Sequence, residues 1–321
     1  MRKYFIGVLL AAVLLTGCSS SEEMLSYDNE TSTSSIQAVS SNDKAKPLSS
    51  QVCVIPKDKL STKDTTLAAS ASLLVDASEE KMIYADNIYQ KLYPASITKI
   101  LTTLVTLKHG NLDDTVTFSK EAANITYPGA KLCGFKEGDK IKLKDLLYAF
   151  MIYSGNDAGQ AIAEHIAGSE DAFAVMMNKE AKAVGASNSN FVNPHGLHDD
   201  NHYTTAYDIY LIFNECIKND TFLDIINQGS ITVDYETQDG TKKQATFAST
   251  NRYLKGTARA PQGITVIGGK TGTTDKAGSC LVLYSQDSMK KGYISVVLNA
   301  RTGTELFSEM TYLLGKTTKD Q

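Results

Sequence analysis

A serine and a lysine three residues apart, Ser96 and Lys99, form the first pair in this sequence that could do chemistry. In a helix this spacing puts both side chains on one face, with Cβ atoms about 5–6 Å apart. A serine hydroxyl is a weak nucleophile at neutral pH and needs an adjacent base. A lysine can be that base when burial or a nearby cation lowers its pKa. The pair therefore predicts a serine nucleophile that is activated by a neutral lysine.

The residues around this pair favour a buried helix that would hold both groups. Pro94 suits a helix start, apolar residues recur at helical spacing from Ile97 to Leu107, and Gly110 closes the run. We expect Ser96 in the first turn, where backbone N–H groups lack helical partners and one of them could stabilise an oxyanion. The Ser-x-x-Lys pattern occurs four times in the chain, so it is weak evidence on its own.

A second polar cluster, Ser154 and Asn156 around Gly155, falls in a predicted turn between two helical segments. A hydroxyl there could relay a proton to a leaving amine. An amide there could hold a substrate carbonyl and the catalytic lysine together. Because Ser-x-Asn also occurs at two other places, this cluster is weak evidence unless it is combined with the other elements.

The third element comprises Lys270, Thr271, Gly272 and Thr273, at the end of a predicted strand. The charge of Lys270 would attract a substrate carboxylate and lower the pKa of Lys99. The hydroxyls of Thr271 and Thr273 would bind that carboxylate, and Gly272 would let a substrate strand lie against this edge. The backbone N–H of Thr273 would be a second oxyanion donor beside that of Ser96.

Together and in this order, the three elements resemble the motifs of the penicillin-recognising serine enzymes. Within that superfamily the chain is similar to the serine-type D-alanyl-D-alanine carboxypeptidases, which are low-molecular-mass penicillin-binding proteins. The stretches that carry the resemblance are Tyr93–Lys99, Ser154–Ala158, Phe191–Leu197 and Lys270–Gly278.

The resemblance implies a two-step mechanism without metal or cofactor. Lys99 would deprotonate Ser96, which would attack the carbonyl between two terminal D-alanines of a peptidoglycan pentapeptide stem. Ser154 would relay a proton to the leaving D-alanine, and water would then hydrolyse the acyl-enzyme. Asn156 would position the substrate, and the Lys270 strand would hold its carboxylate. Penicillin and other β-lactams would acylate the same serine and act as covalent inhibitors.

The order of predicted elements favours an α+β fold in which both chain ends share one antiparallel sheet flanked by helices. The expected strands are Ala68–Val75, Lys81–Tyr84, Val116–Phe118, Lys140–Leu143, Ile231–Tyr235, Thr265–Gly268, Ser279–Tyr284 and Tyr293–Asn299. The further expected helices are Asp145–Tyr153, Ala158–Ala167, Glu170–Val184, Ala206–Lys218 and Glu305–Leu314. A mostly helical lobe, about residues 100–260, would be inserted within a catalytic domain of residues 66–316. This arrangement is β-lactamase/transpeptidase-like, and the cleft beside the lobe is a usual place for an active site.

The N-terminus has the pattern of a lipoprotein signal peptide in residues 1–18, with a basic start, a short apolar run and a lipobox-like end at Cys18. The resemblance to a lipobox implies cleavage before Cys18 and lipid attachment to its thiol; the alternative is an ordinary secretory signal. Residues 19–65 are rich in serine and predict a disordered tether. We therefore expect a protein held by lipid at the extracytoplasmic face of a bacterial cell membrane.

Composition excludes some other classes. The chain has 321 residues, 42% of them apolar, which is enough for a sizeable core. Its net charge of -4, without a long basic run, gives no reason to expect a nucleic-acid partner. The four remaining cysteines could pair in three ways, but their spacing favours free thiols; they are Cys53, Cys133, Cys216 and Cys280.

Four alternatives stay open at this stage. A class A β-lactamase would need a glutamate to activate the deacylating water, and no glutamate lies between Ala181 and Asn214. The same acyl-enzyme could serve a DD-endopeptidase that cuts cross-links, and a non-hydrolytic penicillin sensor lipoprotein would bind without release. A metallopeptidase is disfavoured because His195, His198 and His202 lack a His-Glu-x-x-His pattern.

One feature of many relatives has no clear counterpart in the motifs. These relatives place an additional arginine near the substrate carboxylate. Arg301, which follows the last predicted strand, is the candidate for that position.

Overall fold

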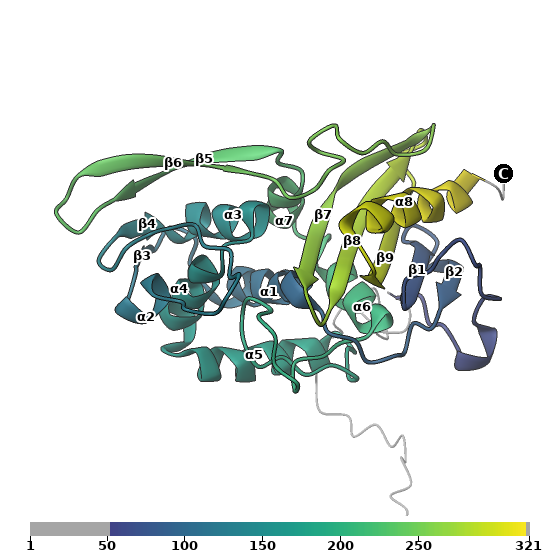
Figure 1. The fold of residues 1–321 in the computed structure, drawn as a ribbon, viewed down its shortest axis with the longest axis horizontal. Helices are drawn as coiled ribbons and strands as arrows, with labels where there is room; N and C mark the ends of the chain where they lie inside the picture. The colour runs from purple at the N-terminus through teal and green to yellow at the C-terminus, as the bar shows by residue number, and fades with distance from the viewer. Residues whose placement is uncertain (1–51, 319–321) are drawn as a thin grey trace, which may run out of the picture. The chain divides into compact units, whose positions relative to one another are not determined.

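The computed structural model describes residues 52–318 (Figure 1). The predicted signal peptide, Cys18 and most of the predicted tether lie outside the described residues. Cys53 and Ile55 are buried in the main hydrophobic core, so the chain is already packed before position 66. The expected tether boundary at residue 65 is therefore too late, because two apolar side chains in this segment are covered by the fold.

A five-stranded antiparallel sheet combines both ends of the described chain, as predicted (Figure 1). Its strands lie in the order β2-β1-β9-β8-β7. Their bounds are Lys81–Asp86 for β2, Ala71–Asp76 for β1, Gly292–Ala300 for β9, Gly278–Asp287 for β8 and Ile264–Thr274 for β7. Strand β7 is an edge strand, so one side of its backbone is not paired within this sheet.

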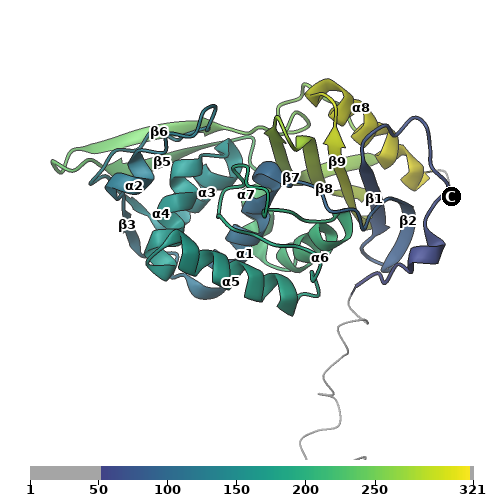
Figure 2. The same cartoon turned by 60° about the horizontal axis from the view of Figure 1, so that its bottom comes forward.

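Helices cover both faces of this sheet (Figure 2). The C-terminal helix α8, Gly303–Leu314, packs on one face and contacts β8 and β9. On the other face, α6, Ala206–Cys216, contacts β1 and β9. Side chains alternate between the two faces along each strand, as shown by Leu73 and Leu74, which belong to different hydrophobic clusters.

The middle of the chain contains the predicted helices, with ends within a few residues of the expected positions. They are α1 Lys99–His109, α3 Leu143–Tyr153, α4 Asn156–Ala167, α5 Glu170–Ala183 and the α6 helix. Two shorter helices, α2 Lys120–Ala123 and α7 Asp220–Ile226, were not expected. Short 3-10 turns add η2 Lys57–Lys59, η3 Ala95–Thr98 and η4 Gly315–Thr318. Within residues 52–318, no helix combines the length and the apolar character needed to cross a membrane.

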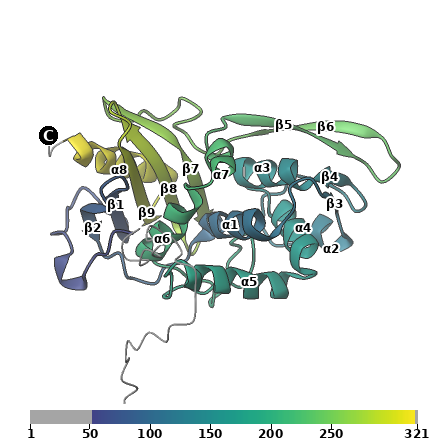
Figure 3. The ribbon, with the colours of Figure 1, turned by 180° about the vertical axis from the view of Figure 1, so that it is seen from behind.

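A second antiparallel sheet lies in the same region, which is therefore less purely helical than expected (Figures 1 and 3). Its strands are β3 Thr115–Thr117, β4 Lys140–Lys142, β5 Ser230–Glu236 and β6 Lys242–Ala248, in that order. The sequence did not predict β6, because its first three residues are polar and exposed. Pairing with β5 over the whole length of β6 overrides this weak local preference.

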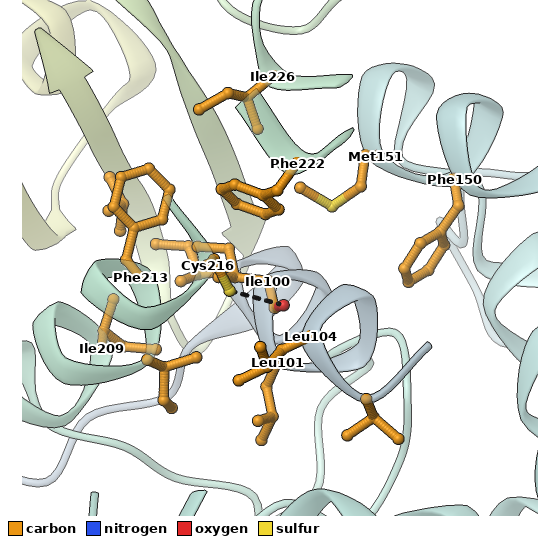
Figure 4. Close-up of a cluster of buried hydrophobic side chains, with 14 of the residues drawn as sticks. Ile100, Leu101, Leu104, Phe150, Met151, Ile209, Phe213, Cys216, Phe222 and Ile226 are labelled. Carbon is orange, nitrogen blue, oxygen red and sulfur yellow. Dashed lines mark hydrogen bonds between the residues drawn. The ribbon is translucent and has the colours of Figure 1, made fainter. Parts of the chain in front are cut away.

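Helix α1 is the centre of the main hydrophobic core (Figure 4). All residues from Lys99 to Thr106 are buried, because other helices surround this segment. The labelled neighbours come from α3, α6 and α7, and they include Phe150, Phe213 and Phe222. A helix buried on all sides holds the first residues of its N-terminus, where Lys99 lies, in one position.

Candidate active site

Ser96 lies in the 3-10 turn η3, and helix α1 begins three residues later at Lys99. We expected Ser96 in the first turn of the long helix, but it lies in the 3-10 turn directly before that helix. The preceding residue, Ala95, has a left-handed backbone with φ of 48°, which is uncommon for a residue with a side chain. Gly196 packs directly against this turn, since a Cβ atom on Gly196 would lie 1.9 Å from the Ala95 carbonyl oxygen.

The side chain of Lys99 is fully buried and its Nζ atom has three partners. Nζ lies 3.1 Å from the Ser96 hydroxyl, 2.8 Å from the amide oxygen of Asn156 and 2.6 Å from the carbonyl oxygen of His195. Burial lowers the pKa of Lys99 well below its ordinary value, and the charge of Lys270 lowers it further. The sequence thus predicted a pair that the structure places within hydrogen-bonding distance.

Ser154, Gly155 and Asn156 connect two helices, as predicted. Ser154 ends α3 in a left-handed conformation with φ of 75°, and Asn156 is the first residue of α4. A side chain on Gly155 would force its neighbours to move, because its Cβ atom would lie 2.3 Å from the sulfur and 3.0 Å from the backbone nitrogen of Cys133. This tight connection turns the Ser154 hydroxyl and the Asn156 amide toward the two lysines.

Asp157 fixes a neighbouring loop to this connection, and sequence reasoning assigned it no role. Its buried carboxylate accepts hydrogen bonds from the backbone N–H groups of Cys133 and Gly134, both at 2.8 Å. The N–H of Asn156 donates to the carbonyl oxygen of Lys131 at 2.7 Å. The only sequence signal was the position of Asp157, directly after the Ser154 to Asn156 motif.

The Lys-Thr-Gly segment lies inside strand β7, which continues to Thr274 instead of ending before Lys270 as expected. Lys270 is buried, and its Nζ atom donates to the Ser154 hydroxyl at 3.0 Å and to the carbonyl oxygen of Thr271 at 2.8 Å. The pKa of Lys270 is lowered to about 7, mainly by burial and to a lesser extent by the charge of Lys131. Lys270 is therefore connected to the site by its hydrogen bond to the Ser154 hydroxyl.

Gly272 brings β7 directly against the Ser96 turn. A Cβ atom on Gly272 would lie 2.9 Å from the backbone nitrogen of Ser96 and 3.0 Å from that of Ile97. Only a residue without a side chain leaves the Ser96 N–H accessible from this strand. The backbone of Thr273 follows immediately, so both expected oxyanion donors lie on facing segments.

The two threonines of this strand have partners of their own. The Thr271 hydroxyl lies 2.6 Å from the Thr250 hydroxyl, and the Thr273 hydroxyl donates to the carbonyl oxygen of Gly272 at 2.8 Å. Thr250 was missed because it sits in a Ser-x-Asn pattern that we treated as a chance repeat. Its contact with Thr271 shows that the segment before β7 also borders the site.

Arg301 is engaged on the surface. Its guanidinium forms a salt bridge with Glu305 in the first turn of α8, and its side chain is 84% exposed. The charge of Arg301 is therefore already neutralised by a neighbouring carboxylate, which does not support its candidacy as an additional carboxylate ligand.

One of the histidines that suggested a metal site, His202, has hydrogen-bond partners of its own. His202 is buried between the Thr98 hydroxyl, 2.7 Å from Nε2, and the backbone N–H of Val192, which donates to Nδ1 at 3.1 Å. Burial lowers the pKa of His202 to about 4, so the ring is neutral. Across residues 52–318, histidine, cysteine and acidic side chains form no group of three or more that could hold a metal ion. As predicted, the four cysteines named above are free thiols.

A Ser–Lys pair, a Ser-Gly-Asn turn and a Lys-Thr-Gly strand in an antiparallel sheet make up the motif arrangement of the penicillin-recognising serine enzymes. Comparison with known proteins agrees with this class. Residues 58–302 match the Peptidase_S11 family model, described as D-alanyl-D-alanine carboxypeptidase. The chain belongs to this family.

Characterised relatives show the same relationship. The chain is 34% identical over 266 residues to D-alanyl-D-alanine carboxypeptidase DacF of Bacillus subtilis, covering 80% of this chain and 64% of DacF. It is 34% identical over 255 residues to DacC of Escherichia coli, covering 77% of this chain and 60% of DacC. The chain thus spans less than two thirds of the length of these relatives.

Solved structures have the same fold. The Streptomyces K15 DD-transpeptidase superposes with a TM-score of 0.73 at 27% identity, covering 80% of this chain and 98% of that one. Penicillin binding protein 5 from Haemophilus influenzae superposes with a TM-score of 0.69 at 30% identity, covering 79% of this chain and 72% of that one. Because the K15 chain is covered almost completely, the shared part includes the whole of that smaller fold.

Proposed function

We propose that this protein is a serine DD-peptidase that removes the terminal D-alanine from peptidoglycan pentapeptide stems through an acyl-ester on Ser96. The observation that carries the proposal is the environment of Lys99. Its amine is buried, lies 3.1 Å from the Ser96 hydroxyl and is bordered by the cation of Lys270. These conditions favour the neutral amine that a general base must be.

The partners of Lys99 also orient this base. A neutral amine has two N–H bonds and one lone pair. The amide oxygen of Asn156 and the carbonyl oxygen of His195 can only accept, so they take the two N–H bonds. The lone pair is then left for the Ser96 hydroxyl. In the acylation step, Ser96 Oγ bonds to the carbonyl carbon while its proton passes to Lys99 Nζ.

The leaving group needs a proton when the peptide bond breaks. Ser154 is suited to deliver it, because its hydroxyl is held at 3.0 Å by Lys270. The proton gained by Lys99 can return through the Ser154 hydroxyl to the nitrogen of the departing D-alanine. The backbone N–H groups of Ser96 and Thr273 would stabilise the oxyanion of the tetrahedral intermediate.

The substrate would bind as an added strand along the free edge of β7. The Lys270 ammonium, with the Thr271 and Thr273 hydroxyls, would hold the terminal carboxylate. The Asn156 amide would bind the stem on the acyl side. Water would then hydrolyse the ester, with Lys99 again acting as base. A β-lactam would form the same ester and act as a covalent inhibitor.

We further propose that the protein is a lipoprotein, held at the extracytoplasmic face of the bacterial membrane by lipid on Cys18. The support is the signal-peptide pattern of residues 1–18 and its lipobox-like end. Labelling of cells with a radioactive fatty acid tests this directly. We expect the label on the wild-type protein and its loss in Cys18→Ala; an equally labelled variant would contradict the proposal.

Mass spectrometry of muropeptides tests the main proposal. Purified protein is expected to release one D-alanine from a pentapeptide, and Ser96→Ala is expected to abolish the release. Cleavage of cross-linked muropeptides in the same assay would add endopeptidase activity. Acylation by penicillin without any peptide product would instead identify a penicillin sensor and contradict the peptidase.

A further inference from the structure

Thr250 lies between β6 and β7, and its hydroxyl contacts the Lys-Thr-Gly strand. Its Oγ1 atom is 2.6 Å from Oγ1 of Thr271, and both residues are half-buried. This distance is at the short end of the range for hydrogen bonds between hydroxyl groups. A hydroxyl can donate or accept, so this contact alone allows either threonine to be the donor.

The backbone around Thr250 is fixed to the helix that ends at the proposed proton relay. The N–H of Thr250 donates to the carbonyl oxygen of Ile152 at 3.3 Å, and Ile152 lies in α3 two residues before Ser154. The next residue, Asn251, is only 1% exposed, and its side-chain oxygen accepts from the backbone N–H of Tyr253 at 3.1 Å. Thr250 therefore contacts β7 from a fixed backbone position.

A count of protons gives the direction of the Thr250–Thr271 hydrogen bond when a substrate is bound. In the proposed function the Thr271 hydroxyl binds the terminal carboxylate, which can only accept. Thr271 has one hydroxyl proton, so that proton goes to the carboxylate. The contact with Thr250 then remains a hydrogen bond only if Thr250 donates. This proton is available, because across residues 52–318 the structure shows Thr271 Oγ1 and no second acceptor as the partner of Thr250 Oγ1.

Thr273, the other threonine of this strand, is held differently. Its hydroxyl donates to the carbonyl oxygen of Gly272 at 2.8 Å, so its proton is used by its own strand and must leave that acceptor to reach a carboxylate. Thr271 instead has a neighbouring hydroxyl that can donate to it. A hydroxyl that accepts a hydrogen bond becomes a stronger donor in the next one. Thr271 is therefore the hydroxyl that its surroundings prepare for the carboxylate.

We propose that Thr250 is a positioning residue for the terminal carboxylate of the substrate. Its hydroxyl donates to Thr271 Oγ1 and so turns the Thr271 O–H toward the carboxylate. Thr250 acts through Thr271 and needs no contact with the substrate. The inference rests on the proposed function and names a residue that strengthens its selection for a leaving group with a free carboxylate.

Two matched thioesters of one N-acylated D-alanine test this role. The leaving group is mercaptoacetate in one and ethanethiol in the other, so a carboxylate is exchanged for a methyl group. We expect kcat/KM of the wild-type protein to be at least about tenfold higher for the mercaptoacetate thioester, because hydrogen bonds to a charged group are strong. Thr250→Val keeps the shape of the side chain without its hydroxyl and should lower this ratio about three- to tenfold. A wild-type ratio of one, or an unchanged ratio in Thr250→Val, would overturn the proposal.

Two further variants test whether the hydroxyl acts, and whether it acts through Thr271. Thr250→Ser restores the hydroxyl and should restore most of the ratio; a ratio as low as in Thr250→Val would assign the loss to packing and overturn the proposal. In a Thr271→Val background, Thr250→Val should change the ratio by less than about twofold, because the group that it positions is already absent. A full additional loss in that background would contradict an action through Thr271.

A second pair of threonines provides the matched control. The Oγ1 atoms of Thr232 and Thr246 lie 2.8 Å apart on the exposed surface of β5 and β6. Thr246→Val removes the same type of hydrogen bond and should keep the wild-type ratio, whereas an equal fall there would show that the effect is not specific to Thr250. Thermal unfolding shows whether each variant is folded, and Thr250→Ala repeats the test if Thr250→Val is not.

The inference can fail separately from the proposed function. If the wild-type protein is acylated by benzylpenicillin but hydrolyses neither thioester, the peptidase proposal fails. The second-order rate constants for acylation by benzylpenicillin and by its methyl ester then give the same comparison, because only the first has a free carboxylate. A ratio that falls in Thr250→Val would still support the role of Thr250, and an unchanged ratio would overturn it. A protein that reacts with none of the four compounds would contradict both proposals.

Discussion

The carbonyl oxygen of His195 lies 2.6 Å from the Nζ atom of Lys99. The acceptor in this contact is a backbone carbonyl oxygen, which carries no proton and no net charge. It orients the amine toward Ser96 without stabilising the ammonium form as a carboxylate would. The His195 carbonyl oxygen thus favours a neutral Lys99 amine, which can act as a base, over a charged Lys99 in an ion pair.

The pH dependence of kcat/KM should follow the ionisation of Lys99 and Lys270. Lys99 must be neutral, so the rate should rise as the pH rises through its lowered pKa. Lys270 must be charged to bind the carboxylate, and its pKa is lowered to about 7, so kcat/KM should fall above that pH. The fall should be weaker in kcat, because a bound carboxylate raises the pKa of Lys270.

Lys270→Arg provides the check on this assignment. Arginine stays charged throughout, so the descending limb should disappear even though the altered shape lowers the rate. A descending limb that persists in Lys270→Arg would assign it to another group. The measurement is D-alanine release across the pH range for both proteins.

Gly272→Ala should damage the chemistry of the proposed site. The added methyl group would lie 2.9 Å from the backbone nitrogen of Ser96, where the oxyanion is expected. Loss of one oxyanion donor reduces kcat by about 10²–10³-fold. Gly229→Ala is the matched control, because its Cβ atom would have no neighbour closer than 3.6 Å. Acylation by penicillin as fast in Gly272→Ala as in Gly229→Ala would contradict this role.

Gly196→Ala should destabilise the protein through the Ser96 turn. Its φ of 85° disfavours any side chain, and the Cβ atom would lie 1.9 Å from the Ala95 carbonyl oxygen. Backbone strain of about 1–2 kcal/mol then adds to about 1–3 kcal/mol of overpacking.

Gly168→Ala separates the two contributions to this loss. Gly168 has a similar φ of 81° but nothing within 4 Å of the Cβ position, so it reports strain alone. Denaturant unfolding should rank the free energies of unfolding as wild type, then Gly168→Ala, then Gly196→Ala. Equal losses in the two variants would mean that the contact with Ala95 relaxes freely.

The sequence predicted the three motifs and the shared sheet because both depend on patterns that are local in the chain. Side-chain types at short spacing marked Ser96, Ser154 and Lys270 as candidates, and the resemblance to the penicillin-recognising serine enzymes predicted that they share one site. Alternating or helical apolar periodicity located most helices and strands to within a few residues. Sequence order alone then favoured one sheet built from both ends.

What the sequence did not reveal depends on contacts between remote segments. The continuation of β7 through Gly272 comes from pairing with β8, where Gly272 lies opposite Cys280. Glycine and threonine alone do not predict a strand. The carbonyl oxygen of His195 has no sequence signature at all, since every residue carries one. The contact of the Thr250 hydroxyl with Thr271 likewise arises only when distant segments meet.

Penicillin should form a long-lived ester on Ser96. Among the described residues, the hydrogen-bond partners of Lys99 Nζ are a hydroxyl, an amide and a backbone carbonyl, and no carboxylate is among them. Within residues 52–318, no carboxylate is therefore hydrogen-bonded to this amine to serve as a second base for deacylating water. We expect the adduct to persist for many minutes, which intact-protein mass spectrometry detects as the mass gain of one penicillin. Ser96→Ala is the control and should gain no mass. Turnover of penicillin within seconds by purified protein would show that another group activates water, and would move the assignment toward a β-lactamase.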